Sequence, residues 1–263
     1  LQNCIRLTDE LKFRIHDLLL EKINISKKVQ MGADGEPTTF IDRFAEDFIL
    51  KKIKSNYKCT IMSEESGTQY YGDKELIFII DPIDGTSNAE IKLPFFTCSI
   101  GVYYKNIPLT GIVRDLYNGD VFYGIYESGA YLNGKRIQMK GGINLKNSIG
   151  TIGRPLSSKD MELYKKLNFN TKSNRVISCP SLEICYSASG KTDWCVQVHK
   201  NPRATIMDIA AAKIIIKEAG GILIYPNGED IPIILDTKFK FNFIGCRNDK
   251  KIIGQILDLI DYN

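Results

Sequence analysis

The 263-residue chain has the composition of an ordinary globular protein, with 43% hydrophobic and 25% charged residues. These proportions exclude a disordered or fibrous chain, and the length is enough for a large buried core. The 35 Lys and Arg against 31 Asp and Glu give a net charge of only +4, which argues against a nucleic-acid-binding protein. No uncharged apolar run reaches about 18 residues, so the sequence predicts no membrane span.

The seven cysteines are scattered along the chain, and no two of them have the CxxC spacing of a zinc site or redox motif. Buried, reduced thiols in a cytoplasmic protein are therefore the expectation. The first ten residues contain Arg6, Asp9 and Glu10 and lack the basic start and apolar centre of a secretion signal.

The first elements expected along the chain are two helices separated by a loop. Apolar residues recur at helical spacing over residues 4–24, and a Gly/Pro-rich loop follows over 31–39. Thr39 and Asp42 form the T-x-x-D start of a second helix, whose apolar face continues to Ile53.

The next elements expected are strands. The apolar runs 59–62 and 76–80 are expected to be buried strands, and the pattern from Phe95 to Tyr126 is typical of β-structure. Asn118-Gly119 is a hairpin signal within it, and Asn133-Gly134 marks another turn. In the second half, helices are expected at 158–167, 180–190, 207–219 and 248–260, and strands at 175–178, 193–198, 221–224 and 240–245. This mixture indicates layers of helices and sheets rather than a parallel α/β wheel.

The most informative segment is LIFIIDPIDGTSN, residues 76–88. Asp81 and Asp84 follow an apolar strand at its carboxyl end, where open α/β sheets bind their ligands. Hard cations such as Mg²⁺ prefer clustered carboxylate oxygens together with phosphate. Gly85 lets the chain approach a ligand closely, and Thr86 adds a hydroxyl. Taken alone, such a segment is more often simply an Asx-turn with a Pro-fixed bend.

Three further acidic segments lie at the ends of predicted elements. Glu64 and Glu65 follow the strand at 59–62, Asp208 opens an Ala-rich helix, and Asp42 lies in the first turn of another helix. Each has a simple structural explanation, as a solvated pair or as a helix cap. The four segments together predict a metal site more strongly than any one of them does.

Three segments together resemble the signature motifs of the inositol monophosphatase superfamily. They are SEES (63–66), DPIDGTSN (81–88) and MDIAAAKIIIKEAGG (207–221), and their order and spacing fit the family over nearly the whole chain. The earlier segment MGADGEPTTFID (31–42) resembles most the archaeal branch, which is described as dual inositol monophosphatase and fructose-1,6-bisphosphatase. The resemblance implies an α+β protein built as a five-layered α/β/α/β/α sandwich, and a cytoplasmic, homodimeric, lithium-sensitive phosphatase that depends on magnesium.

The resemblance also implies a set of metal ligands. Glu64 would bind metal, Asp81 would bridge metals, the backbone carbonyl of Ile83 would be a further ligand, and Asp84 and Asp208 would hold a second ion. Two or three Mg²⁺ per active site are implied, with Mn²⁺ as a substitute.

The same motifs imply which residues act on the phosphate. Asp42 and Thr86 would activate the attacking water, and Glu64 belongs to the same catalytic set. The phosphate would be received by Asp84, Gly85, Thr86 and Ser87. Residues 32–39 would form a mobile loop that completes the site.

Charge is divided unevenly along the chain. We expect residues 1–133 to form a metal-binding half and residues 134–263 to form a half with the substrate pocket and the last metal ligand, within one compact catalytic unit. Residues 31–90 contain 12 acidic and 6 basic residues, whereas residues 131–206 contain 4 acidic and 13 basic. A basic rim opposite the metals would suit a second phosphate on the substrate.

The candidates for that rim are Arg154, Arg175, Lys191, Lys200 and Arg203. Each by itself is most simply a solvated surface charge, but Lys200 and Arg203 closely precede Asp208. Asn201 stands near the position where inositol-specific relatives tend to have a Glu that contacts the ring hydroxyls. The absence of that Glu argues against strict inositol specificity, and with the basic half it favours a sugar bisphosphate such as fructose 1,6-bisphosphate. The expected substrate is therefore a small sugar or polyol phosphate, namely fructose 1,6-bisphosphate and inositol 1-phosphate.

The segment SCPSLE (178–183) matches the family stretch that lines the sugar or inositol pocket. Ser178, Ser181 and Glu183 are therefore candidate substrate contacts. The same segment is also consistent with a helix N-terminus that has Pro180 in its first turn.

Three other interpretations stay open. Haloacid dehalogenase phosphatases also place acidic residues after an apolar strand, but their D-x-D-G-T motif is one residue shorter than D-P-I-D-G-T. A 3′-phosphoadenosine 5′-phosphate phosphatase of the same fold would also suit a basic rim. A non-enzymatic, transcription-linked binding module would be expected to lose a site carboxylate, whereas all five are present: Asp42, Glu64, Asp81, Asp84 and Asp208.

Overall fold

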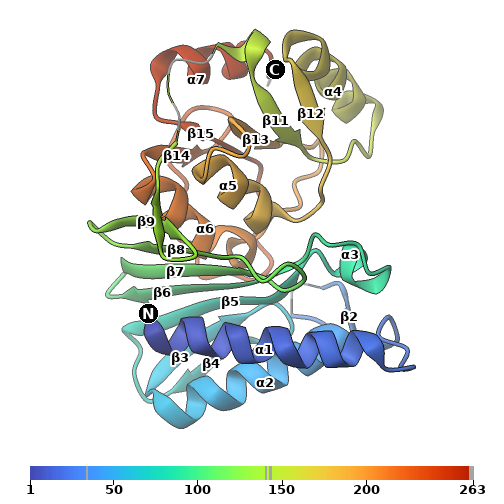
Figure 1. The fold of residues 1–263 in the computed structure, drawn as a ribbon, viewed down its shortest axis with the longest axis vertical. Helices are drawn as coiled ribbons and strands as arrows, with labels where there is room; N and C mark the ends of the chain where they lie inside the picture. Colours follow the sequence, from blue (N-terminus) through green and yellow to red (C-terminus); the bar gives the residue numbers. More distant parts are fainter. Residues whose placement is uncertain (34, 140, 142–143, 261–263) are drawn as a thin grey trace.

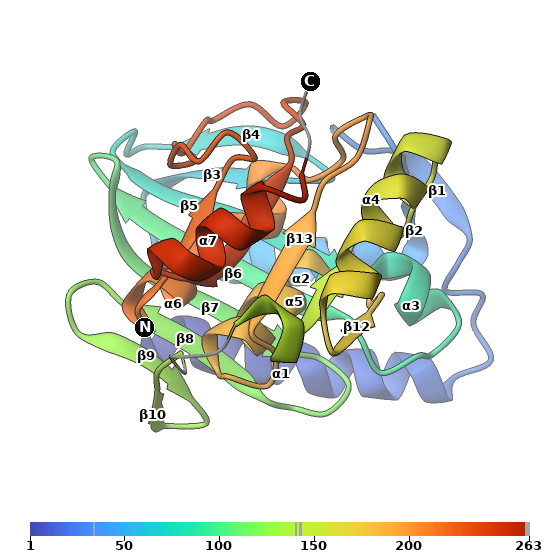
Figure 2. The same cartoon turned by 90° about the horizontal axis from the view of Figure 1, so that it is seen from above.

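The computed structural model describes residues 1–33, 35–139, 141 and 144–260, and it stacks helices and sheets in five layers (Figure 1). Helices α1 and α2 cover the outer face of the first sheet, α5 and α6 lie between the two sheets, and α4 and α7 cover the second sheet (Figures 1 and 2). The helices are α1 (Gln2–Leu20), α2 (Phe40–Asn56), α3 (Thr86–Glu90), α4 (Ser158–Asn170), α5 (Pro180–Ala188), α6 (Ile206–Glu218) and α7 (Lys250–Leu257), with a 3₁₀ turn at Leu145–Asn147. The predicted α+β, five-layered sandwich is confirmed.

The first sheet has eight strands in the order β10-β9-β8-β7-β6-β5-β3-β4. Only β3 and β5 pair in parallel, and all other neighbours are antiparallel. Its strands are β3 (Cys59–Ser63), β4 (Gly67–Tyr71), β5 (Leu76–Asp84), β6 (Thr97–Tyr104), β7 (Ile107–Asp115), β8 (Val121–Ile125), β9 (Gly129–Leu132) and β10 (Lys135–Ile137). The central strand β5 is buried almost throughout, so the residues that end it lie in the middle of the molecule.

The second sheet has five strands in the order β12-β11-β13-β15-β14. Its strands are β11 (Ile149–Ile152), β12 (Ser173–Arg175), β13 (Trp194–Gln197), β14 (Gly221–Ile224) and β15 (Phe243–Arg247). A separate hairpin of β1 (Lys28–Met31) and β2 (Pro37–Thr39) precedes α2. The predicted boundary at residue 133 falls in the turn between β9 and β10 of the first sheet, and the division into two halves stays a prediction.

Helix α6 lies in the centre of the sandwich and is apolar on almost every side, as expected for a helix between two sheets. Its alanines lie directly on the first sheet. The helix approaches Gly111 so closely that no side chain would fit at this position, because a Cβ there would collide with the Ala211 carbonyl oxygen. The Tyr103 hydroxyl donates to the carbonyl of Ala210 at 2.7 Å. This close contact holds the start of α6 beside β5.

Several predicted boundaries differ from the structure. Helix α1 ends at Leu20 rather than near residue 24, and the predicted loop at 31–39 is shorter because β2 pairs with β1. Strand β5 does not end before the aspartates but continues to Asp84. The strands expected at 175–178 and 240–245 are shifted to Ser173–Arg175 and Phe243–Arg247.

The remaining elements largely match the sequence. The T-x-x-D start of α2 forms a capping box, and Pro180 occupies the first turn of α5. All seven cysteines are free and buried, as predicted. None of the described helices combines the length and the apolar run that crossing a bilayer requires.

Candidate active site

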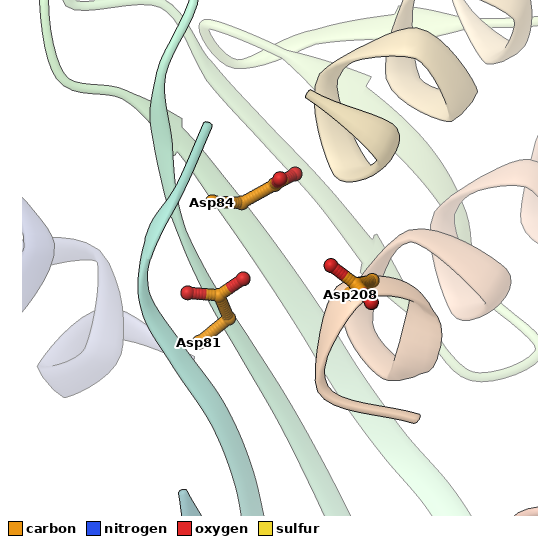
Figure 3. A group of neighbouring side chains, drawn as sticks. All are labelled: Asp81, Asp84 and Asp208. Atoms are coloured by element: carbon orange, nitrogen blue, oxygen red, sulfur yellow. The ribbon is translucent and has the colours of Figure 1, made fainter. Parts of the chain in front are cut away.

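Three carboxylates from two elements converge at the end of β5 (Figure 3). Asp81 and Asp84 lie on β5 and Asp208 lies in the first turn of α6, and one oxygen from each falls within 4.8 Å of the others. Asp81 is only 1% exposed and Asp84 only 4%. The group spans more than 120 residues of sequence, so only the packing of α6 on the sheet brings it together.

An irregularity in β5 turns both of its aspartates toward the site. Asp81 pairs with Ser99 and Asp84 pairs with Thr97, so the four residues 81–84 of β5 lie opposite only the three residues 97–99 of β6. In a regular strand, residues three apart point to opposite faces, but the extra residue of a bulge brings them to the same side. Asp81 is also fixed locally, because its Oδ1 accepts the Ile83 N–H at 3.0 Å.

Asp84 is held by the start of α5. Its Oδ2 accepts the Ser181 N–H at 2.7 Å and the Ser181 hydroxyl at 2.5 Å, and the Cys179 thiol lies at 3.2 Å. Burial and repulsion from Asp208 nevertheless raise the pKa of Asp84 to about 8, against the opposing effect of these donors. The carboxylate is therefore well positioned but poorly compensated.

The negative charge of Asp81 is offset even less by its surroundings. Burial, followed by the negative charges of Glu64, Asp84 and Asp208, raises its pKa well above the ordinary value. In the described part of the chain, no ion pair with Lys or Arg reaches Asp81 or Asp84. Buried carboxylates are normally paired or bound to metal, so this donor set fits divalent cations.

Two equivalent capping boxes place an aspartate at the N-termini of α2 and α6. In α2, Asp42 Oδ2 accepts the Thr39 N–H at 3.0 Å and the Thr39 hydroxyl at 2.5 Å. In α6, Asp208 Oδ2 accepts the Thr205 N–H at 2.6 Å and its hydroxyl at 3.0 Å. The capping role expected for Asp208 is present, and the same carboxylate also belongs to the group that could hold a metal ion. Its role as a metal ligand stays a prediction.

Asp42 and Thr86 form a second unit of the site. The Thr86 hydroxyl lies 2.9 Å from Asp42 Oδ1 and 3.0 Å from the carbonyl oxygen of Ile83. Burial raises the pKa of Asp42 above its usual value, although Thr39 and Thr86 act in the opposite direction. Gly85 precedes Thr86 with φ of 86°, and a Cβ there would come within 2.6 Å of the Phe95 carbonyl oxygen. The predicted pairing of Asp42 with Thr86 is therefore present in the structure.

The turn that carries Glu64 and Glu65 is fixed by its neighbours. Glu46 on α2 is 1% exposed and accepts the Ser66 N–H at 3.0 Å and the Ser66 hydroxyl at 2.8 Å. The Ala33 N–H contacts the carbonyl oxygens of Glu64 and Glu65, both at 3.1 Å. This contact brings the predicted loop at 32–39 over the turn, although residue 34 lies outside the described residues.

The other predicted site residues lie in different settings. Ser87, Ser178, Lys200 and Arg203 are exposed, whereas Ser181 and Glu183 are fully buried. The Ser181 hydroxyl is bonded to Asp84 and also lies 2.6 Å from the Thr97 hydroxyl. Their roles as substrate contacts stay predictions.

Sequence reasoning did not assign Glu46 and Cys179 to the site. Glu46 lies four residues after Asp42, one turn along the same helix, and that spacing was the available signal. Cys179 directly precedes Pro180 as the N-cap of α5, but no pattern in the sequence indicates that its thiol faces Asp84.

Comparison with known proteins agrees with this geometry. Residues 1–256 match the sequence profile of the Inositol monophosphatase family. The chain belongs to this family. Its match contradicts the haloacid dehalogenase alternative, and with the carboxylate group it makes the chain a metal-dependent phosphoric monoester hydrolase.

The chain is also similar to individual members of this family in sequence and in structure. The chain is 34% identical to a fructose-1,6-bisphosphatase of Pyrococcus furiosus, covering 89% of this chain and 88% of the relative. It is 31% identical to a bifunctional NADP phosphatase/NAD kinase of Methanococcus maripaludis, of which it covers only 44%. The crystal structure of an inositol monophosphatase-fructose 1,6 bisphosphatase superimposes with a TM-score of 0.87 at 30% identity, covering 98% of each chain.

Proposed function

We propose that this family member hydrolyses the phosphate monoesters of small sugars and polyols, with fructose 1,6-bisphosphate and inositol 1-phosphate as its substrates. The observation that carries the proposal is the convergence of Asp81, Asp84 and Asp208 within 4.8 Å beside the Asp42–Thr86 pair. The relatives named for these two activities support the choice of substrates.

The carboxylates would hold two or three Mg²⁺, with Mn²⁺ as a substitute. The ligands would be Glu64, Asp81, the carbonyl of Ile83, Asp84 and Asp208. Bound there, the ions would lower the pKa of the attacking water and stabilise the charge that develops on the transferred phosphoryl group.

The chain itself orients the water and the phosphate. Thr86 donates its hydroxyl hydrogen toward Asp42, which leaves the hydroxyl oxygen as an acceptor for a water proton. The Asp42 carboxylate, with its raised pKa, can take up that proton through Thr86. Gly85, Thr86 and Ser87 lie at the start of α3, where the first N–H groups have no partner within the helix and would receive the phosphate.

Lys200 and Arg203 support a substrate with a second anionic group. Both are exposed and lie in the segment that leads into Asp208, so they would meet the part of the substrate that extends beyond the metals. A second phosphate would gain a charge-assisted hydrogen bond from Arg203.

A second candidate is the removal of a phosphate from a nucleotide. The similarity to the bifunctional NADP phosphatase/NAD kinase favours NADP as that substrate, and 3′-phosphoadenosine 5′-phosphate remains the alternative suggested by the sequence. A binding module without catalysis is less consistent with the complete set of carboxylates.

Phosphate release with Mg²⁺ over four substrates tests the proposal. The substrates are fructose 1,6-bisphosphate, inositol 1-phosphate, 3′-phosphoadenosine 5′-phosphate and NADP. We expect the highest kcat/KM for the first two. A clear preference for either nucleotide would replace the proposal, and release from none of the four would favour the binding module. The homodimer, the lithium sensitivity and the cytoplasmic location stay predictions.

A further inference from the structure

Glu183 is a fully buried carboxylate behind the segment that holds Asp84. It lies in the first turn of α5, and its side chain points back to the residues that precede the helix. Its Oε1 accepts the Ser178 N–H at 3.0 Å. Burial raises its pKa to about 7, against the effect of the donors around it. A buried carboxylate is costly unless its oxygens accept hydrogen bonds, so the groups that donate to Glu183 are tied to its position.

The second oxygen of Glu183 connects α5 to the second sheet. Gln197, at the end of β13, donates its Nε2 hydrogen to Glu183 Oε2 at 2.6 Å. The Gln197 Oε1 lies 3.3 Å from His199 Nε2, so the amide contacts both Glu183 and His199. Gly153 makes room for this pair, because a Cβ there would collide with Gln197 Oε1.

The backbone that Glu183 holds is conformationally unusual. Ser178 has φ of 59°, in the left-handed region that is unfavourable for a residue other than glycine. Cys179 and Ser181 follow this turn directly, and they supply the contacts to Asp84 Oδ2. Their positions therefore depend on the conformation of the turn. An unbroken series of hydrogen bonds and short chain segments therefore runs from Gln197 through Glu183 and the turn to Asp84.

We propose that Glu183 is a positioning residue for the metal site, and that its double acceptance from Ser178 and Gln197 sets the orientation of Asp84. For activity, this inference rests on the proposed function. The metal-binding part depends only on the carboxylate site. The sequence suggested that Glu183 contacts the substrate. In this proposal Glu183 acts instead through the turn at Ser178.

The exchange Glu183→Gln tests the role of the two accepted bonds. A glutamine of the same shape has only one acceptor, so either the Ser178 N–H or the Gln197 amide must face another donor. The reciprocal exchange Gln197→Glu places two carboxylates against each other. In the double variant E183Q/Q197E, the amide now at position 183 can accept from Ser178 through its oxygen and donate through its nitrogen to the carboxylate at position 197. The network is then restored with donor and acceptor reversed.

Each single variant is expected to weaken Mn²⁺ binding, measured by calorimetry, and to raise the Mg²⁺ concentration for half-maximal activity, by roughly ten-fold. The double variant should return both values to within about three-fold of the wild type, as expected for directly coupled groups. Ser148→Ala is the matched control. It removes a buried hydrogen bond from Trp194 Nε1 in the same sheet, at 2.7 Å, without touching the turn, and should lower thermal stability while leaving Mn²⁺ affinity unchanged.

The inference is overturned if both single variants bind Mn²⁺ like the wild type, or if the double variant is no better than the singles. Should Glu183→Gln fail to fold, Gln197→Met removes one donor and keeps the carboxylate, and normal Mn²⁺ affinity in that variant would also overturn it. If no substrate is hydrolysed but Mn²⁺ affinity follows the expected pattern, the proposed function fails and the positioning role stands.

Discussion

Asp84 and Asp160 are both almost completely buried, at 4% and 6% exposure, but their surroundings act in opposite directions. Burial and the neighbouring Asp208 raise the pKa of Asp84 to about 8. Burial alone would also raise the pKa of Asp160, but the N–H groups of Lys200 and Leu156, at 2.8 and 3.0 Å, outweigh it and lower the pKa to about 2.

The opposite pKa shifts distinguish a carboxylate that stabilises the fold, Asp160, from one that is suited to bind a cation, Asp84. Asp160 accepts enough hydrogen bonds to remain charged, and it ties the start of α4 to the end of β13. Asp84 accepts three donors from α5 and its N-cap, yet faces other carboxylates. Charge that the protein leaves uncompensated is available to a cation, so a strongly perturbed group here indicates function.

Asp84→Asn should have the largest effect on activity. Loss of a metal ligand is expected to lower phosphate release with Mg²⁺ by about 100-fold or more. The same change should raise the urea midpoint of chelator-treated protein, because it removes one of the repelling charges. The control is Asp160→Asn, whose activity should stay within about two-fold. Near-wild-type turnover of Asp84→Asn would refute the assignment of this ligand.

Thr86→Ala should have the second-largest effect on activity. Without the hydroxyl, Asp42 loses its connection to the attacking water, so kcat should fall by about 100-fold. Mn²⁺ affinity measured by calorimetry should change little, since the Thr86 side chain is not among the proposed ligands. A loss of Mn²⁺ binding equal to the loss of kcat would instead make Thr86 part of the metal site.

Arg203→Ala tests the exposed basic rim against the buried acidic site. We expect KM for fructose 1,6-bisphosphate to rise by roughly ten-fold, which is the loss of one charge-assisted contact. KM for inositol 1-phosphate should be unchanged, because this substrate has no second phosphate. Arg136→Ala, an exposed arginine on β10 outside the predicted rim, is the control. If the protein hydrolyses both substrates at equal rates, and Arg203→Ala changes neither rate, Arg203 does not belong to the substrate site.

Asp160→Asn should have the smallest effect, and it should be an effect on stability. The folded pKa of about 2 lies below the ordinary value of 3.8, so the charged group stabilises the protein above about pH 4 and this contribution is lost as the pH falls toward 2. At pH 7 the variant should be less stable by about 1 kcal/mol, measured by urea unfolding. The difference should shrink on acidification, and a difference independent of pH would show that it does not arise from ionisation.

Local features of the chain were predictable from the sequence because they depend on neighbouring residues. The capping box of Thr39 and Asp42, the Pro180 start of α5 and the turns at Asn118-Gly119 and Asn133-Gly134 all follow from local hydrogen bonding and backbone preference. The motif segments likewise indicated the family and the acidic residues of the site.

The sequence by itself therefore determined the layered fold class, the family and the type of chemistry. Only the tertiary structure decided how the site is assembled. The extra residue of β5 is defined by its pairing with β6, and the close approach of α6 depends on a glycine of β7. The buried contacts of Glu183 join segments on two different layers. Such features follow from long-range packing and from the exclusion of water, and neither is encoded in the spacing of nearby residues.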